Sequence, residues 1–485
     1  MLFNSLAYLL FLPAVFLLYW FVFKRLKVQN WFVIAASYFF YGWWDWRFLS
    51  LLLITSLSGF VSGLALERYE SRQKRRLICT ANIVLNLLIL GLFKYFNFFA
   101  DSLAVLCRSF GYEMDAVTLN LVLPVGISFY TFQALSYTID VYRRTLPATH
   151  DVAAFFAYIS FFPQMMAGPI ERATNLLPQF LRPRTFDCDA ATDGLRQILW
   201  GFFKKVVIAD NCATYVNVIF EHHEGLSGST LLLGAFFFTI QIYCDFSGYS
   251  DIAIGSARLF GIRLMQNFRV PYFSRDVAEF WRRWHISLTT WFRDYVYIPL
   301  GGSRFGKWTS FRNTMVIFLL SGLWHGANWT FVLWGAYHAL LFLPLLLLHR
   351  NRRFRDVVAA GRSLPTFGEL FRMASTFVLV LLGWILFRAE SFSHAIAYIQ
   401  GIFTPSLFST VYIHPAWNLS LFTGIMTFVF ILVMFLFEWL HRDRPHALCL
   451  RTPNMPLRTA TYTVFLLIVY FFNAANPVGF IYFQF

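Results

Sequence analysis

Long apolar runs separated by short polar stretches dominate the chain. A bilayer core takes about 20 apolar residues per helical span, and the runs recur along the whole sequence. They occupy 5–23, 31–41 with 49–66, 77–100, 117–140, 152–168, 195–220, 229–260, 313–348, 373–388, 417–439 and 459–481. The two runs at 229–260 and 313–348 are long enough for more than one helix each. The pattern predicts an all-α polytopic membrane protein with about eleven to thirteen transmembrane or re-entrant helices.

The composition of the chain supports a membrane protein. Of its 485 residues, 58% are hydrophobic and 13% are charged, whereas soluble domains are nearer half apolar and a quarter charged. No internal repeat or low-complexity linker interrupts the sequence, so we treat 1–485 as a single membrane-embedded domain. The net charge of +15 comes from basic residues scattered between apolar runs. This distribution indicates membrane orientation and contact with lipid headgroups, and it argues against nucleic-acid binding.

Basic clusters predict the orientation of the chain. The first apolar run has no basic residue before Lys24 and no small-residue cleavage site, so we expect it to remain as a membrane helix. Lys24, Arg25 and Lys27 follow that run directly, which by the positive-inside rule predicts an amino terminus outside the cytoplasm. Later clusters fit the cytoplasmic side, and they lie at 68–76, 143–144, 204–205 and 350–355.

The segment 267–308 differs from the rest of the chain. It is rich in Trp, Tyr, Phe and Arg and is too charged to cross lipid unaided, so we interpret it as an amphipathic or re-entrant segment. Pro271 near its start and Pro299 near its end are turn signals. Between them the periodicity predicts one helix over 276–296, whose aromatic face consists of Trp281, Trp284, Leu288, Trp291, Phe292 and Tyr295.

The charged and titratable residues of that helix have two interpretations each. Arg282, Arg283, Arg293 and Asp294 fall away from the aromatic face, and His285 lies at its edge. An interfacial helix explains the tryptophans and arginines. A histidine turned toward the packed side instead indicates a polar cavity, so His285 is a candidate site residue. Arg282 and Arg293 either anchor the helix to headgroups or bind the phosphates of a cofactor, and the sequence leaves both open.

Polar residues also occur inside a later apolar run. Gln241, Asp245 and Tyr249 are spaced i, i+4, i+8 and so share a helix face. A carboxylate at membrane depth costs a few kcal/mol, so these residues either line a substrate cavity or brace one helix against another. Both interpretations remain open for Gln241 and Asp245. For Asp251, elsewhere on the circumference, we expect a brace.

The sequence predicts no metal site. The tetrapeptide EHHE at 221–224 lacks the i, i+4 histidine spacing of a helical zinc site. The six cysteines show no CxxC or other metal-binding spacing.

The stretch SGLWHGANW at 321–329 places a histidine and an asparagine between two strongly apolar runs. If one helix continues through 321–345, His325 and Asn328 share a face, and Asn328 can orient the imidazole or bind a substrate oxygen. Imidazole is the natural general base near neutral pH, and Gly326 leaves room for a ligand beside it. A satisfied structural histidine is the alternative, and we interpret His338 in that way.

Taken together, these motifs resemble those of the membrane-bound O-acyltransferases, specifically the bacterial branch that acetylates cell-envelope polysaccharides. The matching stretches span nearly the whole chain: FFPQMMAGPIER (161–172), DFSGYSDIAIG (245–255), NFRVPYFSRDVAEFWRRWHISLTTWFRDYVYIPLGG (267–302), LSGLWHGANWTFVLWG (320–335) and FIYFQF (480–485). The resemblance implies that His325 of the WHG motif is catalytic and that His285 of the WHISL motif is its companion. The candidates for substrate binding are then Trp324, Asn328, Gln241, Asp245 and Tyr249.

The same resemblance implies a reaction across the bacterial inner membrane. Its fold is a ring of helices around a central funnel, with His325 near the narrowest point. The implied donor is acetyl-CoA from the cytoplasm, for which Arg282 and Arg293 are the candidate binding residues. The implied acceptor is alginate, peptidoglycan or another exopolysaccharide. The implied partners are membrane lipids, the polysaccharide machinery and a periplasmic SGNH-type acetyltransferase.

Two other classes of function compete with an acyltransferase. A transporter or flippase of a glycan or lipid-linked intermediate would explain the intramembrane Asp245 and the many spans, but transporters often show matching halves, which we do not find. A non-catalytic scaffold of a polysaccharide machine is the other class. The chain has neither a GxSxG nor a Gly-Asp-Ser motif, so no serine nucleophile is predicted, and His325 would deprotonate an incoming hydroxyl directly.

Overall fold

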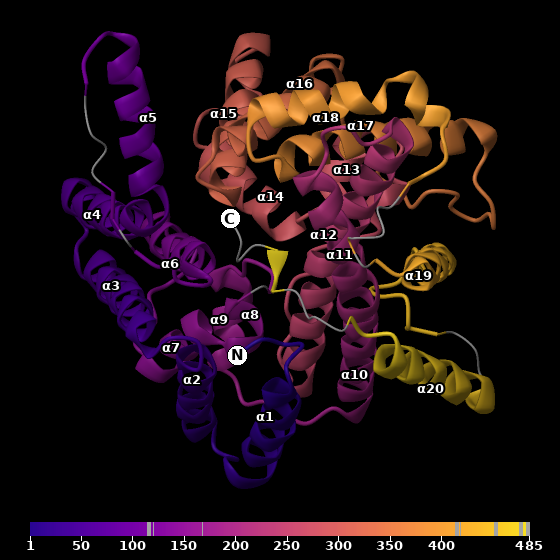
Figure 1. Ribbon diagram of the computed structural model, residues 1–485. Coiled ribbons are helices and arrows are strands. Elements are labelled where there is room, and N and C mark those ends of the chain that lie inside the picture. Colours follow the sequence, from indigo (N-terminus) through magenta and orange to yellow (C-terminus); the bar gives the residue numbers. More distant parts are fainter. Residues whose placement is uncertain are drawn as a thin grey trace. The chain divides into compact units, whose positions relative to one another are not determined.

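The helices of the chain are seen in a computed structural model (Figure 1). The structure describes residues 1–113, 118–119, 121–166, 168–412, 417, 419–450, 454–474 and 479–481. The elements assigned within those ranges are all helices, which confirms the predicted fold class.

Six helices are long and apolar enough to cross a membrane, among the residues that the structure describes. They are Trp46–Arg68, Arg72–Ser109, Gly228–Leu259, Trp329–Leu347, Phe367–Arg388 and Leu421–Leu440. Three shorter apolar helices occur at Leu6–Val22, Val152–Met165 and Met455–Phe471. The protein is therefore a multi-pass membrane protein, and the higher count expected from the sequence stays a prediction.

The chain divides into two compact units. The first unit contains residues 1–194 and 256–265, and the second contains 195–255 and 266–485. The helices within the first unit are α1 (Leu6–Leu17), η1 (Leu18–Val22), α2 (Leu26–Gly42), η2 (Trp46–Phe48), α3 (Leu49–Arg68), α4 (Arg72–Leu90), η3 (Gly91–Tyr95), α5 (Phe96–Ser109), α6 (Ile127–Tyr142), α7 (Val152–Ser160), α8 (Phe162–Met165) and α9 (Ala173–Phe180).

In the first unit a buried arginine joins the ends of two helices. Helices α3 and α4 pack against α6. The guanidinium of Arg75 donates to the carbonyls of Leu66 on α3 and of Val141 and Tyr142 on α6, the last two at 3.0 and 2.9 Å. Because the last carbonyls of a helix have no partner within it, these hydrogen bonds allow both ends to be buried.

The second unit contains most of the remaining helices. Helix α10 (Cys188–Phe202) begins in the first unit and continues into the second. Helix α12 (Gly228–Leu259) begins in the second unit, and its last residues belong to the first. The others are η4 (Phe203–Ala209), α11 (Asp210–Glu221), η5 (Pro271–Phe273), α13 (Val277–Arg283), α14 (Ile286–Phe292), η6 (Arg293–Tyr297), α15 (Lys307–His325), α16 (Trp329–Leu347), α17 (Phe367–Arg388), α18 (Phe392–Ile402), η7 (Pro405–Phe408), α19 (Leu421–Leu440) and α20 (Met455–Phe471).

The two longest apolar runs fold differently from each other. The run at 229–260 forms the single helix α12, whereas the run at 313–348 contains two helices, α15 and α16, that pack against each other. Glycines bring the backbones of this pair close together, because a Cβ at Gly322 would collide with the carbonyl of Phe331 and a Cβ at Gly335 with that of Phe318. The condition of one continuous helix over 321–345 is not met, because α15 ends at His325 and α16 begins at Trp329. The expectation of more than one helix in the run 313–348 is confirmed.

The expected single helix over 276–296 is wrong. Helix α13 ends at Arg283 and α14 begins at Ile286, and between them His285 has a φ of 43°, in the left-handed region. This conformation costs energy for a residue with a side chain, so it persists only where the surroundings hold it. On the aromatic face every side chain is buried except that of Tyr295, which is half-buried. Arg283 is buried too, with its guanidinium 2.8 Å from the carboxylate of Glu279.

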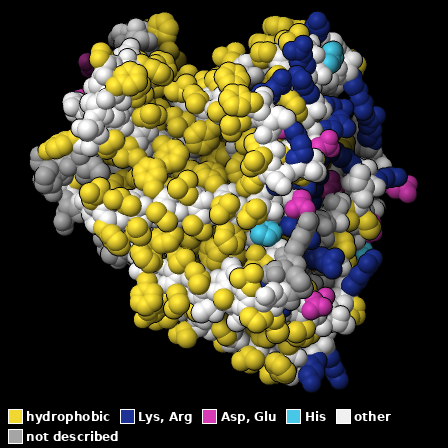
Figure 2. Space-filling model, turned by 90° about the vertical axis from the view of Figure 1, so that its right-hand side faces the viewer, with side chains coloured by type: hydrophobic (Ala, Val, Ile, Leu, Met, Phe, Trp, Pro, Cys, Tyr) yellow, Lys and Arg dark blue, Asp and Glu magenta, His cyan; other side chains and the backbone are white. Residues whose placement is uncertain are grey.

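Two helices of the second unit expose long rows of apolar side chains. In α19 these include Leu421, Phe422, Ile425, Leu432, Leu436 and Leu440, and in α20 they include Leu457, Val464, Leu466, Leu467 and Tyr470. Figure 2 shows hydrophobic side chains gathered over a broad area and Lys and Arg side chains gathered apart from them. Such a separation fits a surface that meets lipid tails in one region and headgroups or water in another.

Candidate functional site

His325 is the last residue of α15, where the chain turns into α16. Its side chain is buried, at 3% exposure. The turn that follows requires a glycine, because a Cβ at Gly326 would lie inside the ring of Phe331. The imidazole of His325 is therefore held at the carboxyl end of α15, where the chain turns toward α16.

Asn328 does not reach the imidazole in the way a continuous helix would allow. It is the N-cap of α16, where its Oδ1 accepts a hydrogen bond from the N–H of Thr330 at 3.0 Å. Its Nδ2 donates to the carbonyl of Glu390, at 3.1 Å, in the connection between α17 and α18. The side chain of Asn328 therefore fixes the turn after His325, which is a supporting role one step removed from the ring.

His285 is held by the backbone of a separate segment. The N–H of Ile286 donates to the carbonyl of Asn267 at 2.9 Å, and the hydroxyl of Ser287 donates to its Oδ1 at 2.9 Å. His285 itself is 1% exposed, and neither ring nitrogen has a hydrogen-bond partner among the described residues. Burial lowers the pKa of His285 to about 3, so its imidazole is neutral at physiological pH and can offer one N–H donor and one acceptor.

The structure brings three of the predicted site residues together. The ring centroids of His285 and His325 are 6.3 Å apart. Trp324 lies beside both, with centroid distances of 5.6 Å to His285 and 5.0 Å to His325. The two imidazoles and the indole of Trp324 therefore form one buried cluster of rings.

Aromatic rings enclose His325 on its other sides. Trp334 lies edge-on at 5.1 Å and Phe387 at 5.3 Å, measured between ring centroids. Trp334 in turn packs against His338, which is fully buried at a centroid distance of 5.0 Å. An enclosure of this kind excludes water and so strengthens electrostatic interactions with a reacting group.

The polar residues of α12 serve mainly as braces. Oδ1 of Asp245 lies 2.7 Å from Nζ of Lys205, and its Oδ2 accepts the N–H of Ile481 at 2.6 Å. The Tyr249 ring lies 5.5 Å from the same Nζ. Gln241 is buried, and its Oε1 has no hydrogen-bond partner among the described residues. These three side chains are not brought to the histidine pair by any contact that we observe.

Asp251 is a brace, as predicted. Its carboxylate lies 2.6 Å from Nζ of Lys204 and accepts a hydrogen bond of 2.7 Å from Nε2 of Gln197. Lys204 and Lys205 are only 3% and 1% exposed. The expectation that this pair of lysines meets lipid headgroups is therefore wrong: π-helix η4 turns both ammonium groups into the protein, toward carboxylates.

The two candidate phosphate-binding arginines lie away from the histidines. Arg282 donates to the carbonyls of Asn351 and Phe354, the second at 2.6 Å. The guanidinium of Arg293 is largely exposed and lies 2.6 Å from the carboxylate of Asp294. Arg282 thus ties α13 to the basic loop before α17, and its role toward a cofactor stays a prediction.

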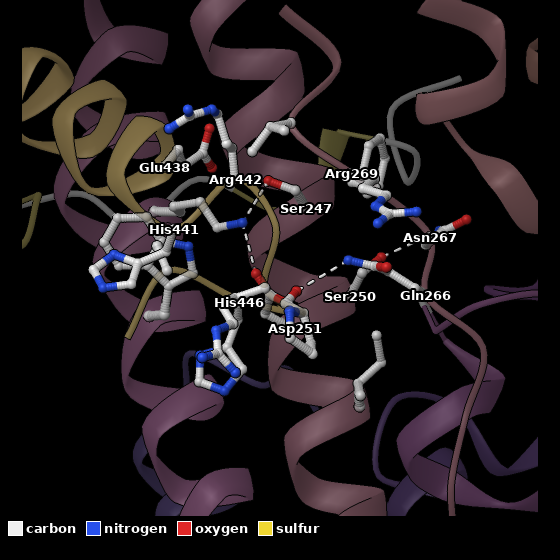
Figure 3. A pocket seen from close by; sticks show the side chains of 18 of the residues that line it. Ser247, Ser250, Asp251, Gln266, Asn267, Arg269, Glu438, His441, Arg442 and His446 are labelled. Atoms are coloured by element: carbon white, nitrogen blue, oxygen red, sulfur yellow. Dashed lines mark hydrogen bonds and ion pairs between the residues drawn. The ribbon is translucent and has the colours of Figure 1, made fainter. Parts of the chain in front are cut away.

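The second unit also contains a polar pocket that sequence reasoning missed (Figure 3). It lies among η4, α12, the 266–270 segment, the end of α19 and the residues that follow α19. Nζ of Lys204 donates to the hydroxyl of Ser247 at 2.9 Å, and the hydroxyl of Tyr243 donates to Glu438 at 2.7 Å. The cationic residues that line the pocket are Lys204, Arg269, Arg442 and Arg444, with His441 and His446 beside them.

One lining residue connects this pocket to His285. Nδ2 of Asn267 donates to the hydroxyl of Ser250 on α12 at 3.2 Å, while its Oδ1 and carbonyl hold the start of α14. Asn267 therefore both lines the pocket and holds the start of α14, next to His285. The buried lysine pair within an apolar run was the available signal, since an intramembrane charge marks a functional or paired site.

Comparison with known proteins adds a family to this geometry. Residues 39–387 match the model of MBOAT, the membrane-bound O-acyltransferase family. A probable alginate O-acetylase AlgI of Azotobacter vinelandii is 42% identical over 393 residues, which cover 81% of this chain and 76% of that protein. A peptidoglycan O-acetyltransferase of Helicobacter pylori is 32% identical over 433 residues, covering 83% of this chain and 80% of that protein.

A more distant relative acts on a different polymer. A teichoic acid D-alanyltransferase of Bacillus subtilis is 27% identical over 291 residues, which cover 57% of this chain and 71% of that protein. The matched region of the family includes both histidines and the intervening helices.

Proposed function

Because the chain belongs to the membrane-bound O-acyltransferase family and is an O-acyltransferase, we propose that it transfers acetyl from acetyl-CoA to a hydroxyl of a cell-envelope polysaccharide. The relatives named for alginate and for peptidoglycan O-acetylation support an acetyl group and a glycan acceptor. The acceptor is alginate, peptidoglycan or another exopolysaccharide. The observation that carries the proposal is the buried pair His285 and His325, 6.3 Å apart.

In this mechanism His325 is the general base. Its imidazole takes the proton of the acceptor hydroxyl as the oxygen attacks the thioester carbonyl. The carbon–sulfur bond then breaks, and the imidazolium returns the proton to the leaving thiolate, so the products are the acetyl ester and the CoA thiol. Edge-on contacts with Trp334 and Phe387 limit the ring to one orientation during these two proton transfers.

His285 stabilises the reacting carbonyl in the same mechanism. Its pKa of about 3 keeps the ring neutral, so it contributes an N–H donor to the oxygen that becomes negative in the tetrahedral intermediate. A preorganised donor of this kind is typically worth about 10²–10³-fold in rate. The two histidines thus have separate tasks, one moving a proton and the other stabilising charge.

The polar pocket of Figure 3 is our proposed approach for the donor. Its cationic side chains, Lys204, Arg269, Arg442 and Arg444, outnumber its carboxylates, Asp251 and Glu438, which favours the CoA phosphates. Its wall residue Asn267 adjoins the start of α14. On the basis of the basic clusters of the sequence, we propose that this side is cytoplasmic and that the amino terminus is periplasmic. We propose the bacterial inner membrane as the location, with a periplasmic SGNH-type acetyltransferase as partner.

A turnover assay tests the proposal directly. Purified protein in detergent or nanodiscs, supplied with acetyl-CoA labelled in the acetyl group, should release CoA thiol and label an acetylated glycan or partner. A transporter or flippase of a glycan intermediate would release no thiol. Thiol release that is absent from wild-type protein in the presence of acceptor and partner would reject the acetyl-CoA mechanism.

A further inference from the structure

The described residues near the carboxyl terminus reach into the centre of the second unit. Phe480 and Ile481 are buried, at 0% and 2% exposure. The backbone N–H of Ile481 donates to Oδ2 of Asp245, at the middle of α12, with a distance of 2.6 Å. The chain therefore returns to a helix more than two hundred residues earlier and binds it through its main chain.

The carboxylate that receives this hydrogen bond is itself fixed. Lys205 lies 2.7 Å from Asp245 and 2.6 Å from Asp210, so one ammonium joins η4, α11 and α12. With Oδ1 directed to Lys205, Oδ2 of Asp245 is available to the N–H of Ile481. A hydrogen bond to an ionised acceptor is roughly twice as strong as a neutral one, so residue 481 is held by a specific polar contact as well as by packing.

Aromatic contacts continue from this point to the candidate site. The ring of Phe480 lies 4.5 Å from that of Tyr249 and 5.6 Å from that of Phe246, both on α12. Phe246 packs edge-on against His285, with centroids 4.6 Å apart and planes at 78°. One phenylalanine thus separates Phe480 from His285.

Packing alone orients the His285 ring within the described part of the protein. Neither of its nitrogens has a hydrogen-bond partner there, and its backbone has the left-handed φ of 43°. The rings around it are Phe246 at 4.6 Å, Trp324 at 5.6 Å and Phe268 at 6.5 Å. The nearest of these three rings is the one that Phe480 contacts, so a shift of Phe480 would be transmitted to the imidazole.

We propose that Phe480 and Ile481 are positioning residues of the acyl-transfer site, acting through Phe246 on His285. The inference rests on the proposed function, because it assumes that His285 acts on the reacting group. It assigns the carboxyl-terminal FI pair a role in the rate of the chemical step. A terminus that merely stabilised the fold would instead lower the amount of folded protein without changing its kcat.

The main test removes the hydrogen bond while keeping a side chain of similar size. Ile481→Pro deletes the N–H donor but also fixes φ and restricts the backbone of Phe480, so Ile481→Ala, which keeps the donor and shortens the side chain, serves as the comparison. Phe480→Ala removes the ring, Phe480→Leu restores part of its volume, and Phe471→Ala removes an exposed phenylalanine of α20 as a second control. Each variant is purified, its folded fraction and melting temperature are measured, and kcat and KM for acetyl-CoA are determined per folded protein.

The expected result is a loss of kcat without a comparable change in KM. A displacement of about 1 Å can cost about 10²-fold in rate, so Ile481→Pro and Phe480→Ala should lose between about 10- and 100-fold, and Phe480→Leu should recover most of it. Phe471→Ala should resemble wild type, and Ile481→Ala, which keeps the N–H donor but loses packing, should lose less kcat than Ile481→Pro. In a His285→Ala background, Phe480→Ala should have no further effect, because the residue through which it acts is gone.

Three outcomes would overturn the inference. One is wild-type kcat for both Ile481→Pro and Phe480→Ala, another is a loss explained fully by the folded fraction, and the third is an undiminished effect of Phe480→Ala in the His285→Ala background. In each case an inactive His325→Gln would leave the proposed function standing. An active His325→Gln would instead reject the proposed function itself, whatever the terminal variants show.

Discussion

The imidazole of His285 faces that of His325 across a centroid distance of 6.3 Å, although each ends or interrupts a different helix. His325 terminates α15, and His285 occupies a left-handed break between α13 and α14. Neither ring projects from the middle of a regular helix. Both imidazoles are therefore held where the chain leaves or interrupts a helix.

Replacement of His325 should abolish acetyl transfer without unfolding the protein. General-base catalysis is worth about 10²–10⁴-fold, so His325→Ala should lose at least about 100-fold in kcat. His325→Gln keeps hydrogen-bonding capacity but cannot act as a base, and it should be equally inactive. The measurement is thiol release from acetyl-CoA, with yield and melting temperature as controls. Near wild-type turnover by His325→Gln would show that the residue is a structural histidine.

Replacements of His285 should distinguish the effect of its left-handed backbone conformation from the catalytic effect of its imidazole. Asparagine tolerates the left-handed region better than other side chains, so His285→Asn should fold at least as well as His285→Ala. Both should lose about 10²-fold or more in kcat, as expected for a lost oxyanion donor. Thermal unfolding and kcat are measured on the same samples. If His285→Asn restores both stability and activity, the backbone conformation is what matters and the imidazole is dispensable.

Lysine variants of Arg282 and Arg293 test whether these side chains bind the cofactor. Arg282 already donates to two backbone carbonyls and Arg293 pairs with Asp294, so we expect anchoring roles. Both lysine variants should keep the KM for acetyl-CoA within about twofold, which corresponds to about 0.4 kcal/mol. A several-fold rise in KM at unchanged kcat would instead indicate that a guanidinium binds the donor's phosphates.

Glu171 should make the stability of the protein depend on pH. Its buried carboxylate accepts hydrogen bonds from the N–H of Met265 and from Nδ2 of Asn175, yet burial raises the pKa to about 7 from its ordinary 4.5. Between these values the folded state binds more protons than the unfolded state, so stability falls as pH rises from 4.5 to 7 and is then constant. The full difference is on the order of 3 kcal/mol.

Melting curves of wild type and Glu171→Gln between pH 4.5 and 8 measure this effect. Glutamine keeps one of the two acceptor oxygens and does not titrate, so the variant should lose the decline that Glu171 causes. Its melting temperature at pH 8 should equal or exceed that of wild type. A parallel decline in both proteins would assign the pH dependence to another group.

The orientation of the chain is tested by cysteine labelling. Lys74 is exposed, whereas its neighbour Arg75 is buried against backbone carbonyls and is unsuitable for labelling. In a variant with the exposed Cys188 replaced by serine, Lys74→Cys should react with an impermeant maleimide only after cells are opened, because we expect this residue in the cytoplasm. Labelling in intact cells would reverse the predicted orientation.

The sequence by itself determined the class of the protein and the identity of the two histidines. The hydropathy of a membrane helix depends only on the residues of that helix. The runs at 229–260 and 373–388 accordingly appear in the structure as the helices α12 and α17. The polar Asp251 also implied a partner within the protein, since an unpaired carboxylate is too costly there. Lys204 is that partner, at 2.6 Å.

Only the tertiary structure decided how the site is assembled. The break at His285 is held by hydrogen bonds that Ile286 and Ser287 donate to Asn267, and the turn after His325 is held by the hydrogen bond that Asn328 donates to the carbonyl of Glu390. The periodicity of a segment cannot reveal either helix end, because the residues that stabilise it lie outside that segment. For the same reason the sequence could not show that Lys205 is buried beside Asp245 or that the N–H of Ile481 donates to Asp245. A buried charge or a terminal N–H acquires its role from partners that are distant along the chain.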